Sequence, residues 1–485
     1  MAGTNGYRDS HVRVTSRRLV KASDSTIKPH VVAVANLDLL PQPMPVSMVC
    51  MYPNNKPPAT DFDAVVAAFE SGLPSFLNHF FLFAGRIATN SLSGLPEVSS
   101  NNQGAELVVG ESCGVALASL DDGTTSQCLH SMELPFAANV ALSVQVVSFA
   151  CGGFTVAWRT NHLLVDGSAM SLLVTSWSEL ARTGTLSVSA MPNHNRSLLR
   201  PRSPPSYGAS VDDMFTPLDD TERQVNVLTT QQSFVERLYH IEASDVARLR
   251  EAARREEGGR RATRVEAVSA YLWKALAGVV VGTADTRCRM TWNVDGRQRL
   301  TASSPELRSA ATLRNYVGNV TTSVIREADV EEVLRMPLPD VAAMVREAIA
   351  ASDYGEHFQE LVDWVEEHKN RRYVHTANLG LGSPTLCVAA FASFPLDTDF
   401  GFGHAALAVP TSELRARMCS GRVGIMAKPG GDGSLIASGY LWPQLAAALE
   451  SDEPRVFKPV TAEYLGLSAP LLRRGRLGRL LNSHM

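Results

Sequence analysis

The spacing of apolar and polar residues changes abruptly around position 162. From Gly153 to Thr160 the two kinds of residue alternate, and this period of two predicts a half-buried strand. After Gly167 apolar residues recur every three or four positions, which predicts an amphipathic helix with Ser168 as its cap. His162 therefore lies in a turn between two rigid elements, where its ring can face a cleft. The apolar stripe of the predicted helix consists of Met170, Leu173, Val174, Trp177, Leu180 and Ala181.

The same two periods recur along the rest of the chain. Residues 142–149 alternate like a strand, and we expect them to form a hairpin with the strand before His162. Helical spacing covers 62–73, and Thr263 is placed to cap a further helix. This mixture predicts an α/β protein with open, mixed sheets and helices packed against them. Later strands are predicted over 385–393, 405–409 and 422–428.

The length of the chain predicts two domains. A chain of 485 residues is too long for one ordinary hydrophobic core. Over residues 191–232 the composition shifts to proline, serine, asparagine and aspartate, and the apolar period is lost. We interpret this stretch as a crossover linker between an N-terminal domain, residues 1–190, and a C-terminal domain, residues 233–485.

Composition removes several classes of function. Apolar residues make up 45% of the chain and charged residues 19%, a balance typical of soluble globular proteins. A net charge of −4 without a concentrated basic face gives no indication of nucleic-acid binding. The seven cysteines form no Cys-x-x-Cys pair, so we expect neither a disulfide framework nor a metal site. No stretch has the apolar length of a signal peptide or a membrane span.

The sequence also lacks the common catalytic signatures. Gly-x-Ser-x-Gly, the Walker loop and His-Glu-x-x-His are absent, so hydrolase, nucleotide-driven and zinc-protease mechanisms lack their key residues. Residues 401–406 match Gly-x-Gly-x-x-Ala, but a strand and Pro410 follow where a dinucleotide site needs a helix. No dinucleotide cofactor is expected.

His162 is the first candidate for chemistry. An imidazole titrates near neutral pH, which suits a general base. The alternative is a buried, hydrogen-bonded histidine of the core, because a lone histidine beside an apolar strand is more often structural than catalytic. The choice between a catalytic and a structural role for His162 depends on the other motifs of the chain.

Two motifs far apart in the chain resemble one family. His162, Asp166 and Gly167 form His-x-x-x-Asp-Gly, and residues 399–403 read Asp-Phe-Gly-Phe-Gly. Both are similar to signatures of the BAHD acyltransferases, plant enzymes that move an acyl group from coenzyme A to an alcohol or an amine. The second signature of that family has tryptophan where this chain has Phe402. Weaker matches in the family's order cover residues 81–86, 195–205 and 316–320.

The resemblance implies an architecture and a reaction. It implies two similar domains of the chloramphenicol-acetyltransferase type, with the active site at their interface and a strand exchanged between them. His162 would be the general base, and acyl-CoA would be a co-substrate, with no permanently bound cofactor and no metal. Asp166 would brace the loop rather than take part in the chemistry.

Supporting roles follow from the second signature in the same way. Asp399 would form a salt bridge with Arg297. Gly167, Gly401 and Gly403 would permit backbone angles or close approaches that a side chain would block. These residues would be architectural.

Two positions are candidates for the acceptor pocket. Phe402 lacks the indole N–H of the family's tryptophan, so any oxyanion stabilisation by that group would have to come from elsewhere. Ser393 stands where family members that acylate shikimate or quinate carry an arginine for the acceptor's carboxylate. We therefore expect a neutral alcohol or an amine as acceptor. Residues 144–153 are similar to those of aromatic-amine and agmatine acyltransferases, which favours an amine, and the expected acyl group is hydroxycinnamoyl or benzoyl.

Two readings without catalysis stay open. One is a BAHD-like accessory protein of very-long-chain lipid elongation, against which the retained Asp399, Gly401 and Gly403 count. The other is a small-molecule binding module. We expect a monomer of plant specialised metabolism in the cytoplasm, without a nucleic-acid partner. The alternative location is the peroxisome, because Ser483-His484-Met485 resembles a variant of the Ser-Lys-Leu signal.

Overall fold

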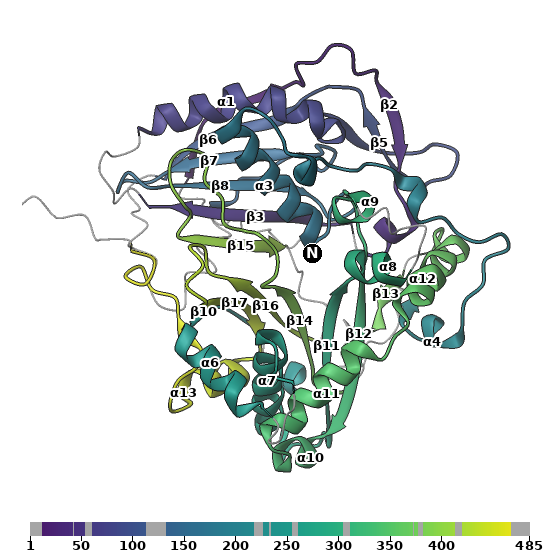
Figure 1. Cartoon of the computed structure of the whole chain (residues 1–485), viewed down its shortest axis with the longest axis vertical. Helices are drawn as coiled ribbons and strands as arrows, with labels where there is room; N and C mark the ends of the chain where they lie inside the picture. Colours follow the sequence, from purple (N-terminus) through teal and green to yellow (C-terminus); the bar gives the residue numbers. More distant parts are fainter. Residues whose placement is uncertain are drawn as a thin grey trace, which may run out of the picture.

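Two large mixed β-sheets, each covered by helices, form the body of the molecule (Figure 1), and a three-stranded and a two-stranded sheet accompany them in the described chain. The computed structural model describes residues 12–41, 43–53, 61–112, 132–217, 227–231, 234–254, 260–303, 311–371, 373–376, 382–412 and 420–466. The C-terminal tripeptide, on which the peroxisomal alternative depends, lies outside these ranges. No helix of the described chain is long and apolar enough to cross a membrane.

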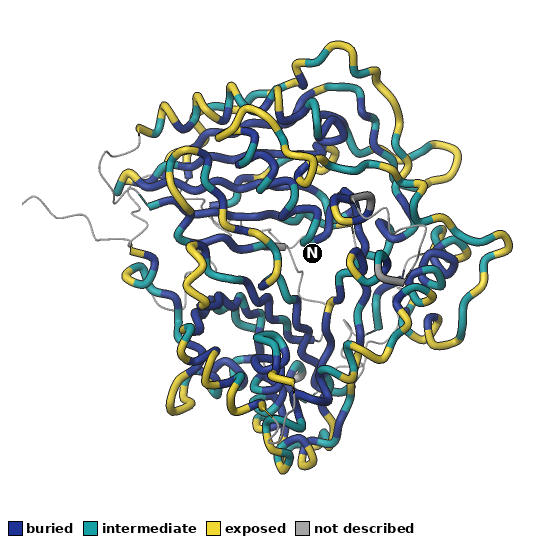
Figure 2. Tube along the Cα trace, viewed as in Figure 1, coloured by how far each residue is buried: buried dark blue, intermediate teal, exposed yellow. Residues whose placement is uncertain are grey.

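The first sheet has six strands in the order β1-β6-β7-β8-β3-β15. The predicted hairpin is confirmed, because β7 and β8 pair antiparallel. Helices α1 and α3 cover this sheet (Figure 1), and Figure 2 shows exposed and buried residues alternating along α1. The elements are β1 (Val12–Val20), β3 (Pro45–Tyr52), α1 (Phe62–His79), β6 (Ala105–Ser112), β7 (Ser143–Ser148), β8 (Phe154–Asn161), α3 (Gly167–Thr183) and β15 (Leu407–Ser412).

One strand of the first sheet comes from the other end of the chain. β15 pairs antiparallel with β3, with Leu407 opposite Met51. The exchange of a strand between the two halves, which the family resemblance implied, is therefore confirmed. It ties the C-terminal half to the first sheet, while the predicted domain boundaries at residues 190 and 233 stay a prediction.

The second sheet has seven strands in the order β12-β11-β14-β16-β17-β10-β18. Its helices include α7, where Thr263 forms the predicted cap and pairs with Glu266 in a capping box. The strands are β10 (Val235–Ile241), β11 (Arg287–Asp295), β12 (Thr321–Asp329), β14 (Thr385–Phe391), β16 (Gly421–Ala427), β17 (Leu435–Leu441) and β18 (Lys458–Pro459). The helices beside them are α6 (Ala243–Ala252), α7 (Arg264–Val280), α10 (Val330–Arg335), α11 (Leu338–Ala350) and α13 (Pro443–Ser451).

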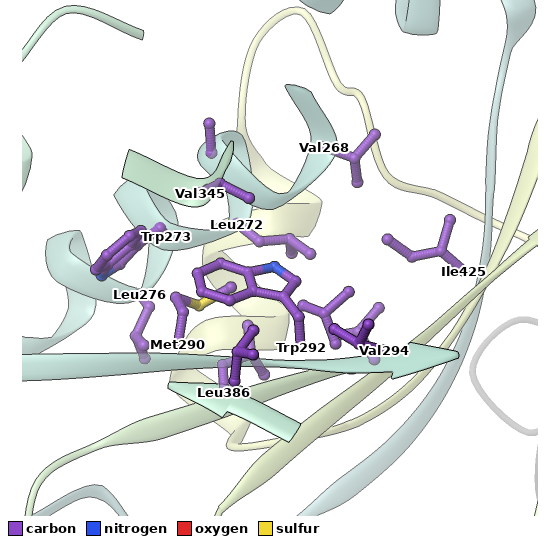
Figure 3. Close-up of a cluster of buried hydrophobic side chains, with 14 of the residues drawn as sticks. Val268, Leu272, Trp273, Leu276, Met290, Trp292, Val294, Val345, Leu386 and Ile425 are labelled. Atoms are coloured by element: carbon purple, nitrogen blue, oxygen red, sulfur yellow. The ribbon is translucent and has the colours of Figure 1, made fainter. Parts of the chain in front are cut away.

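A core of large side chains fills the space between α7 and this sheet. Trp292 projects from β11 between side chains of α7 and of the neighbouring strands (Figure 3). Its indole N–H donates to the Ser269 hydroxyl at 3.0 Å, so its one polar atom is satisfied within the core. On β16, Val423 and Ile425 belong to this core. The alternate residues of β16 must therefore face the opposite side of the sheet.

Smaller elements complete the fold. The predicted linker, residues 191–232, contacts the body of the protein. The guanidinium of Arg202 in this stretch bonds to the carboxylate of Asp363 on α12. The elements are β2 (His30–Ala33), η1 (Asn36–Leu39), η2 (Phe81–Ala84), β4 (Arg86–Thr89), β5 (Pro96–Ser100), η4 (Val188–Ala190), η5 (Arg196–Leu198), α4 (Ala209–Asp212), β9 (Phe215–Pro217), α5 (Val227–Gln231), α8 (Arg297–Ser303), α9 (Ala311–Arg314), α12 (Tyr354–His368) and β13 (Tyr373–His375).

Candidate active site

A cavity lies between the two sheets and is lined by both. β3 and β15 contribute from the first sheet, and β10, β14, β16 and β17 contribute from the second. The turn between β8 and α3 closes one side of it. The lining residues are Met44, Val46, Ser47, Met48, His162, Val165, Asp166, Gly167, Met170, Glu236, Phe391, Val409, Pro410, Thr411, Arg422, Gly424, Met426, Ser438, Gly439 and Tyr440.

His162 is held in this cavity by contacts from both halves of the chain. It follows the last residue of β8, and its backbone N–H donates to the Met44 carbonyl at 2.9 Å. Its carbonyl accepts from the side-chain amide of Asn319 at 2.9 Å. The buried Nδ1 atom has no hydrogen-bond partner among the described residues. The turn is therefore fixed through the backbone of His162, while the Nδ1 atom of the ring lacks the partner expected in a structural histidine.

The surroundings of His162 keep its ring neutral. Burial lowers the pKa of the imidazole below its ordinary value of 6.5, and the positive charge of Arg422 acts in the same direction. A neutral imidazole is the form that accepts a proton. The ring is thus in the state of a general base at pH 7.

The lowered pKa predicts the acid side of the pH profile. With an alcohol acceptor, which does not titrate itself, we expect kcat/KM to be level near neutral pH. Because the pKa of His162 lies below 6.5, the rate should fall only under that pH, by about tenfold per pH unit. Initial rates of thiol release between roughly pH 4.5 and 8, a range that brackets the titration of a histidine, measure this limb. A midpoint clearly above 6.5 would contradict the assignment of the limb to His162.

Asp166 belongs to a buried ion pair. Its Oδ2 atom accepts from Arg297 Nη1 at 2.7 Å and from the Val320 N–H at 2.9 Å. Its Oδ1 atom accepts from the Ala169 N–H at 2.9 Å, so Asp166 and not the predicted Ser168 caps α3. Serine was a reasonable choice from the sequence, but the aspartate two residues earlier accepts the hydrogen bond from the first turn of the helix. Its carboxylate is occupied by donors from both halves.

The predicted salt bridge between Asp399 and Arg297 is wrong. Arg297 is 2% exposed and pairs with Asp166 and Asp295. The backbone of Asp399 bonds to Ser178 instead. Ser178 lies twelve residues beyond Asp166, which is about 18 Å along a helix that rises 1.5 Å per residue. The two carboxylates thus sit at different ends of α3, and only Asp166 can reach the arginine.

The carboxylate of Asp399 instead holds its own loop together. Its Oδ1 atom accepts from the N–H groups of Gly401 at 2.8 Å and Gly403 at 3.0 Å. Both glycines have positive φ, +97° and +90°, with open space where a Cβ would stand. Glycine is therefore required there by the backbone angle rather than by crowding. This loop leads into β15, the exchanged strand.

Gly167 is required for the opposite reason. A Cβ on this residue would stand 2.3 Å from Cε1 and 2.9 Å from Cδ1 of Phe391. The start of α3 and the end of β14 are therefore in close contact beside the cavity. A side chain at this position would have to displace an aromatic ring that lines the cavity.

Neither predicted acceptor-pocket residue lines the cavity. Phe402 packs edge-on against Phe154, with ring centroids 6.1 Å apart. Phe154 begins β8 and His162 follows its end, so the two lie about 26 Å apart at roughly 3.3 Å per residue. The replacement of tryptophan by Phe402 therefore does not touch the chemistry. Ser393 is exposed in the turn after β14, whereas Phe391, two residues earlier, lines the cavity.

Three residues of the site were not predicted. Asn319 belongs to a stretch that matched the family, and its position in a Tyr-x-Gly-Asn pattern was the available signal. Its side chain joins His162 to the buried carboxylate of Asp38, which accepts from Asn319 Nδ2 at 3.1 Å. Asp38 also pairs with Arg196 at 2.8 Å. No pattern in the sequence indicated that Arg422 enters the cavity.

The architecture and the site together define a two-domain acyltransferase of the chloramphenicol-acetyltransferase type. Solved structures share the fold: vinorine synthase has a TM-score of 0.65 at 17% identity and covers 94% of this chain and 98% of its own. TRI101 of F. graminearum, complexed with ethyl coenzyme A, has a TM-score of 0.71 at 14% identity and covers 89% and 99%. The chain belongs to the Transferase family, the BAHD acyltransferases, whose model matches residues 10–443.

Named relatives are similar over most of their length. Putrescine hydroxycinnamoyltransferase of Oryza sativa subsp. japonica is 27% identical, over 81% of this chain and 88% of its own. Omega-hydroxypalmitate O-feruloyl transferase of Arabidopsis thaliana is 26% identical, over 72% and 74%. Anthranilate N-benzoyltransferase protein 1 of Dianthus caryophyllus is 26% identical, over 70% and 75%. Within the described ranges, no three His, Cys, Asp or Glu side chains gather so as to hold a metal ion.

Proposed function

We propose that this acyltransferase moves an aromatic acyl group, hydroxycinnamoyl or benzoyl, from coenzyme A to an amine or an alcohol. The observation that carries the proposal is His162, a neutral and partly unpartnered imidazole in a cavity between the two sheets. The names of the relatives support both parts of it, since they include hydroxycinnamoyl, feruloyl and benzoyl transferases. The neutral acceptor expected from Ser393 is not retained, because that residue lies outside the cavity.

The reaction needs one proton carrier. The N–H or O–H group of the acceptor attacks the thioester carbonyl while His162 takes its proton, and a tetrahedral intermediate forms. The C–S bond then breaks, the acyl group stays on the acceptor, and the coenzyme A thiolate leaves. The imidazolium of His162 returns the proton to that thiolate. Since the thiolate is a stable leaving group, no second acid is required.

Two parts of the structure prepare this step. The ion pair of Asp166 and Arg297 fixes the turn that carries His162. Gly167 and Phe391 bring the second sheet close to that turn. Neither contact requires the side chain of Asp166 to meet the substrates, so we assign it a positioning role.

The test is release of coenzyme A thiol by the purified protein. The donors are p-coumaroyl-, feruloyl- and benzoyl-CoA, and the acceptors are tyramine, tryptamine, agmatine, putrescine and long-chain alcohols. We expect acceptor-dependent release with at least one aromatic donor, and the acylated product by mass spectrometry. An accessory protein or a binding module would bind coenzyme A without release in any combination, and that result would overturn the proposal.

A further inference from the structure

A half-buried cation that lines the cavity has no counter-charge among the residues that the structure describes. Arg422 lies on β16, opposite Cys387 on β14 and Tyr440 on β17. With Gly424 and Met426, at alternate positions of the same strand, it lines the cavity. These residues stand on the face of the sheet opposite the core side chains Val423 and Ile425.

The two buried arginines of the described chain are paired, Arg297 with Asp166 and Asp295 and Arg159 with Glu133. The half-buried Arg196 pairs with Asp38. Arg422 has neither an ion pair nor a side-chain hydrogen bond among the described residues. Burial lowers its pKa, as expected for a guanidinium removed from water without compensation. A charge that is partly removed from water and has no partner does not stabilise the fold, so its place in the wall of a cavity points to a ligand.

The acid in the same cavity does not supply the missing charge. Glu236 lies on β10, also opposite Tyr440, so a whole strand separates it from Arg422. Neighbouring strands are about 4.8 Å apart, which puts the two backbones roughly 10 Å from each other. The charge of Arg422 does reach His162, whose pKa it lowers. The cation therefore belongs to the space in which the reacting groups meet.

We propose that Arg422 binds a carboxylate of one of the two substrates, which makes this enzyme selective for an acid. The planar fork of a guanidinium matches a carboxylate with two parallel hydrogen bonds. Part of the remaining wall is apolar, where Met44, Met170 and Phe391 can hold the body of that substrate. The inference rests on the proposed function, because it assigns a ligand to the cavity of that reaction.

The carboxylate has two possible sources with the same chemistry. It belongs either to the acceptor, as in an amino acid or a hydroxy acid, or to the acyl group of a dicarboxylic acyl-CoA, which would then take the place of the aromatic donor proposed above. Matched pairs that differ only in this group separate the sources. The acceptor arm compares tyrosine with tyramine and arginine with agmatine, each with p-coumaroyl-CoA. The donor arm compares succinyl-CoA with butyryl-CoA, each with tyramine.

The expected result is a preference that depends on Arg422. In one arm the substrate with the carboxylate should have a kcat/KM at least about tenfold above that of the substrate without it. A hydrogen bond to a charged group stabilises a complex by enough free energy for a change of about tenfold. Arg422→Gln should remove this preference through KM, so that the two members of the pair have similar kcat/KM values. Arg422→Lys keeps the charge without the fork and should retain part of the preference.

Arg289→Gln is the matched control. Arg289 lies on β11 of the same sheet, pairs with Glu327 at 3.4 Å and does not line the cavity. The same change there should leave every substrate preference as it is. The Tm of Arg422→Gln should equal or exceed that of the parent, because an unpaired charge has been removed.

Three outcomes would overturn the inference. One is the absence of a preference for the acid in both arms. Another is an equal loss of kcat on all substrates, which would make Arg422 a stabiliser of the oxyanion. The third is an equal rise of KM for every acyl-CoA, which would assign the guanidinium to the phosphates of coenzyme A.

The inference can also be tested without turnover. Added tyrosine or succinyl-CoA should raise the Tm of the parent more than tyramine or butyryl-CoA does, and Arg422→Gln should abolish the difference. If no thiol is released with any pair, the proposed function fails. The Tm shifts then still decide whether Arg422 binds a carboxylate, with equal shifts for both members of each pair counting against it.

Discussion

His162→Ala is expected to lower kcat/KM by about 10²–10⁴-fold, the usual contribution of a general base. The imidazole is the group in the cavity whose lowered pKa leaves it neutral at pH 7, and alanine cannot carry the proton. The backbone contacts of His162 with Met44 and Asn319 do not involve the ring, so the turn should keep its shape. Thiol release at saturating donor measures the loss.

Binding and a second histidine serve as controls for this variant. Coenzyme A should raise the Tm of His162→Ala as much as that of the parent, because the base is not needed for binding. His194→Ala is the matched substitution, since His194 is half-buried like His162 and its pKa is lowered to about 4 by desolvation, but it does not line the cavity. It should keep the parent rate per folded molecule. If His162→Ala retained more than about a tenth of the rate, another group would have to be the base.

Asp166→Ala is expected to produce the largest loss of stability among the site residues. It removes the cap of α3 and one of the two acids that neutralise Arg297, which is 2% exposed. Breaking a buried ion pair costs about 3–5 kcal/mol, and the lower end applies here because Asp295 remains 2.9 Å from Arg297. A drop in Tm of roughly 5–10 °C should be seen by calorimetry.

Two other substitutions show whether this loss comes from the ion pair. Asp166→Asn keeps an oxygen for the cap of α3 and removes only the charge, so its Tm should lie between those of the parent and of Asp166→Ala. Asp399→Ala removes two hydrogen bonds within an exposed loop and should lose only about 1 kcal/mol. If Asp166→Ala melted like the parent yet were inactive, its carboxylate would act in the chemistry instead of positioning the turn.

Several strands and helices could be predicted because each depends on the spacing of apolar residues within a short stretch of the chain. The alternation before His162 and the three-to-four spacing after Gly167 correspond to β8 and α3, and Thr263 caps α7 as predicted. A strand or an amphipathic helix depends mainly on which neighbouring positions are apolar. The two signatures of the family added the position of the base and the exchange of β15.

Pairings between distant residues could not be predicted in this way. Both Asp166 and Asp399 stand in signatures, and the spacing of a signature does not say which of them meets Arg297. The distance along α3 between Asp166 and Asp399 leaves only Asp166 within reach of Arg297. Ser393 and Phe402 were likewise placed by analogy of sequence, but the turn after β14 exposes one and the start of β8 packs against the other.

The sequence by itself determined the class of fold, the family and the histidine that can act as base. Only the tertiary structure decided which charges share the cavity. Arg422 comes from β16, which pairs with β14 and β17 and faces a strand-to-helix turn about 260 residues earlier in the chain. Its side chain enters the cavity because the pleat of β16 turns Val423 and Ile425 to the core and the alternate residues to the other face. Which face meets the other sheet is fixed by packing over the whole molecule, and no local pattern records it.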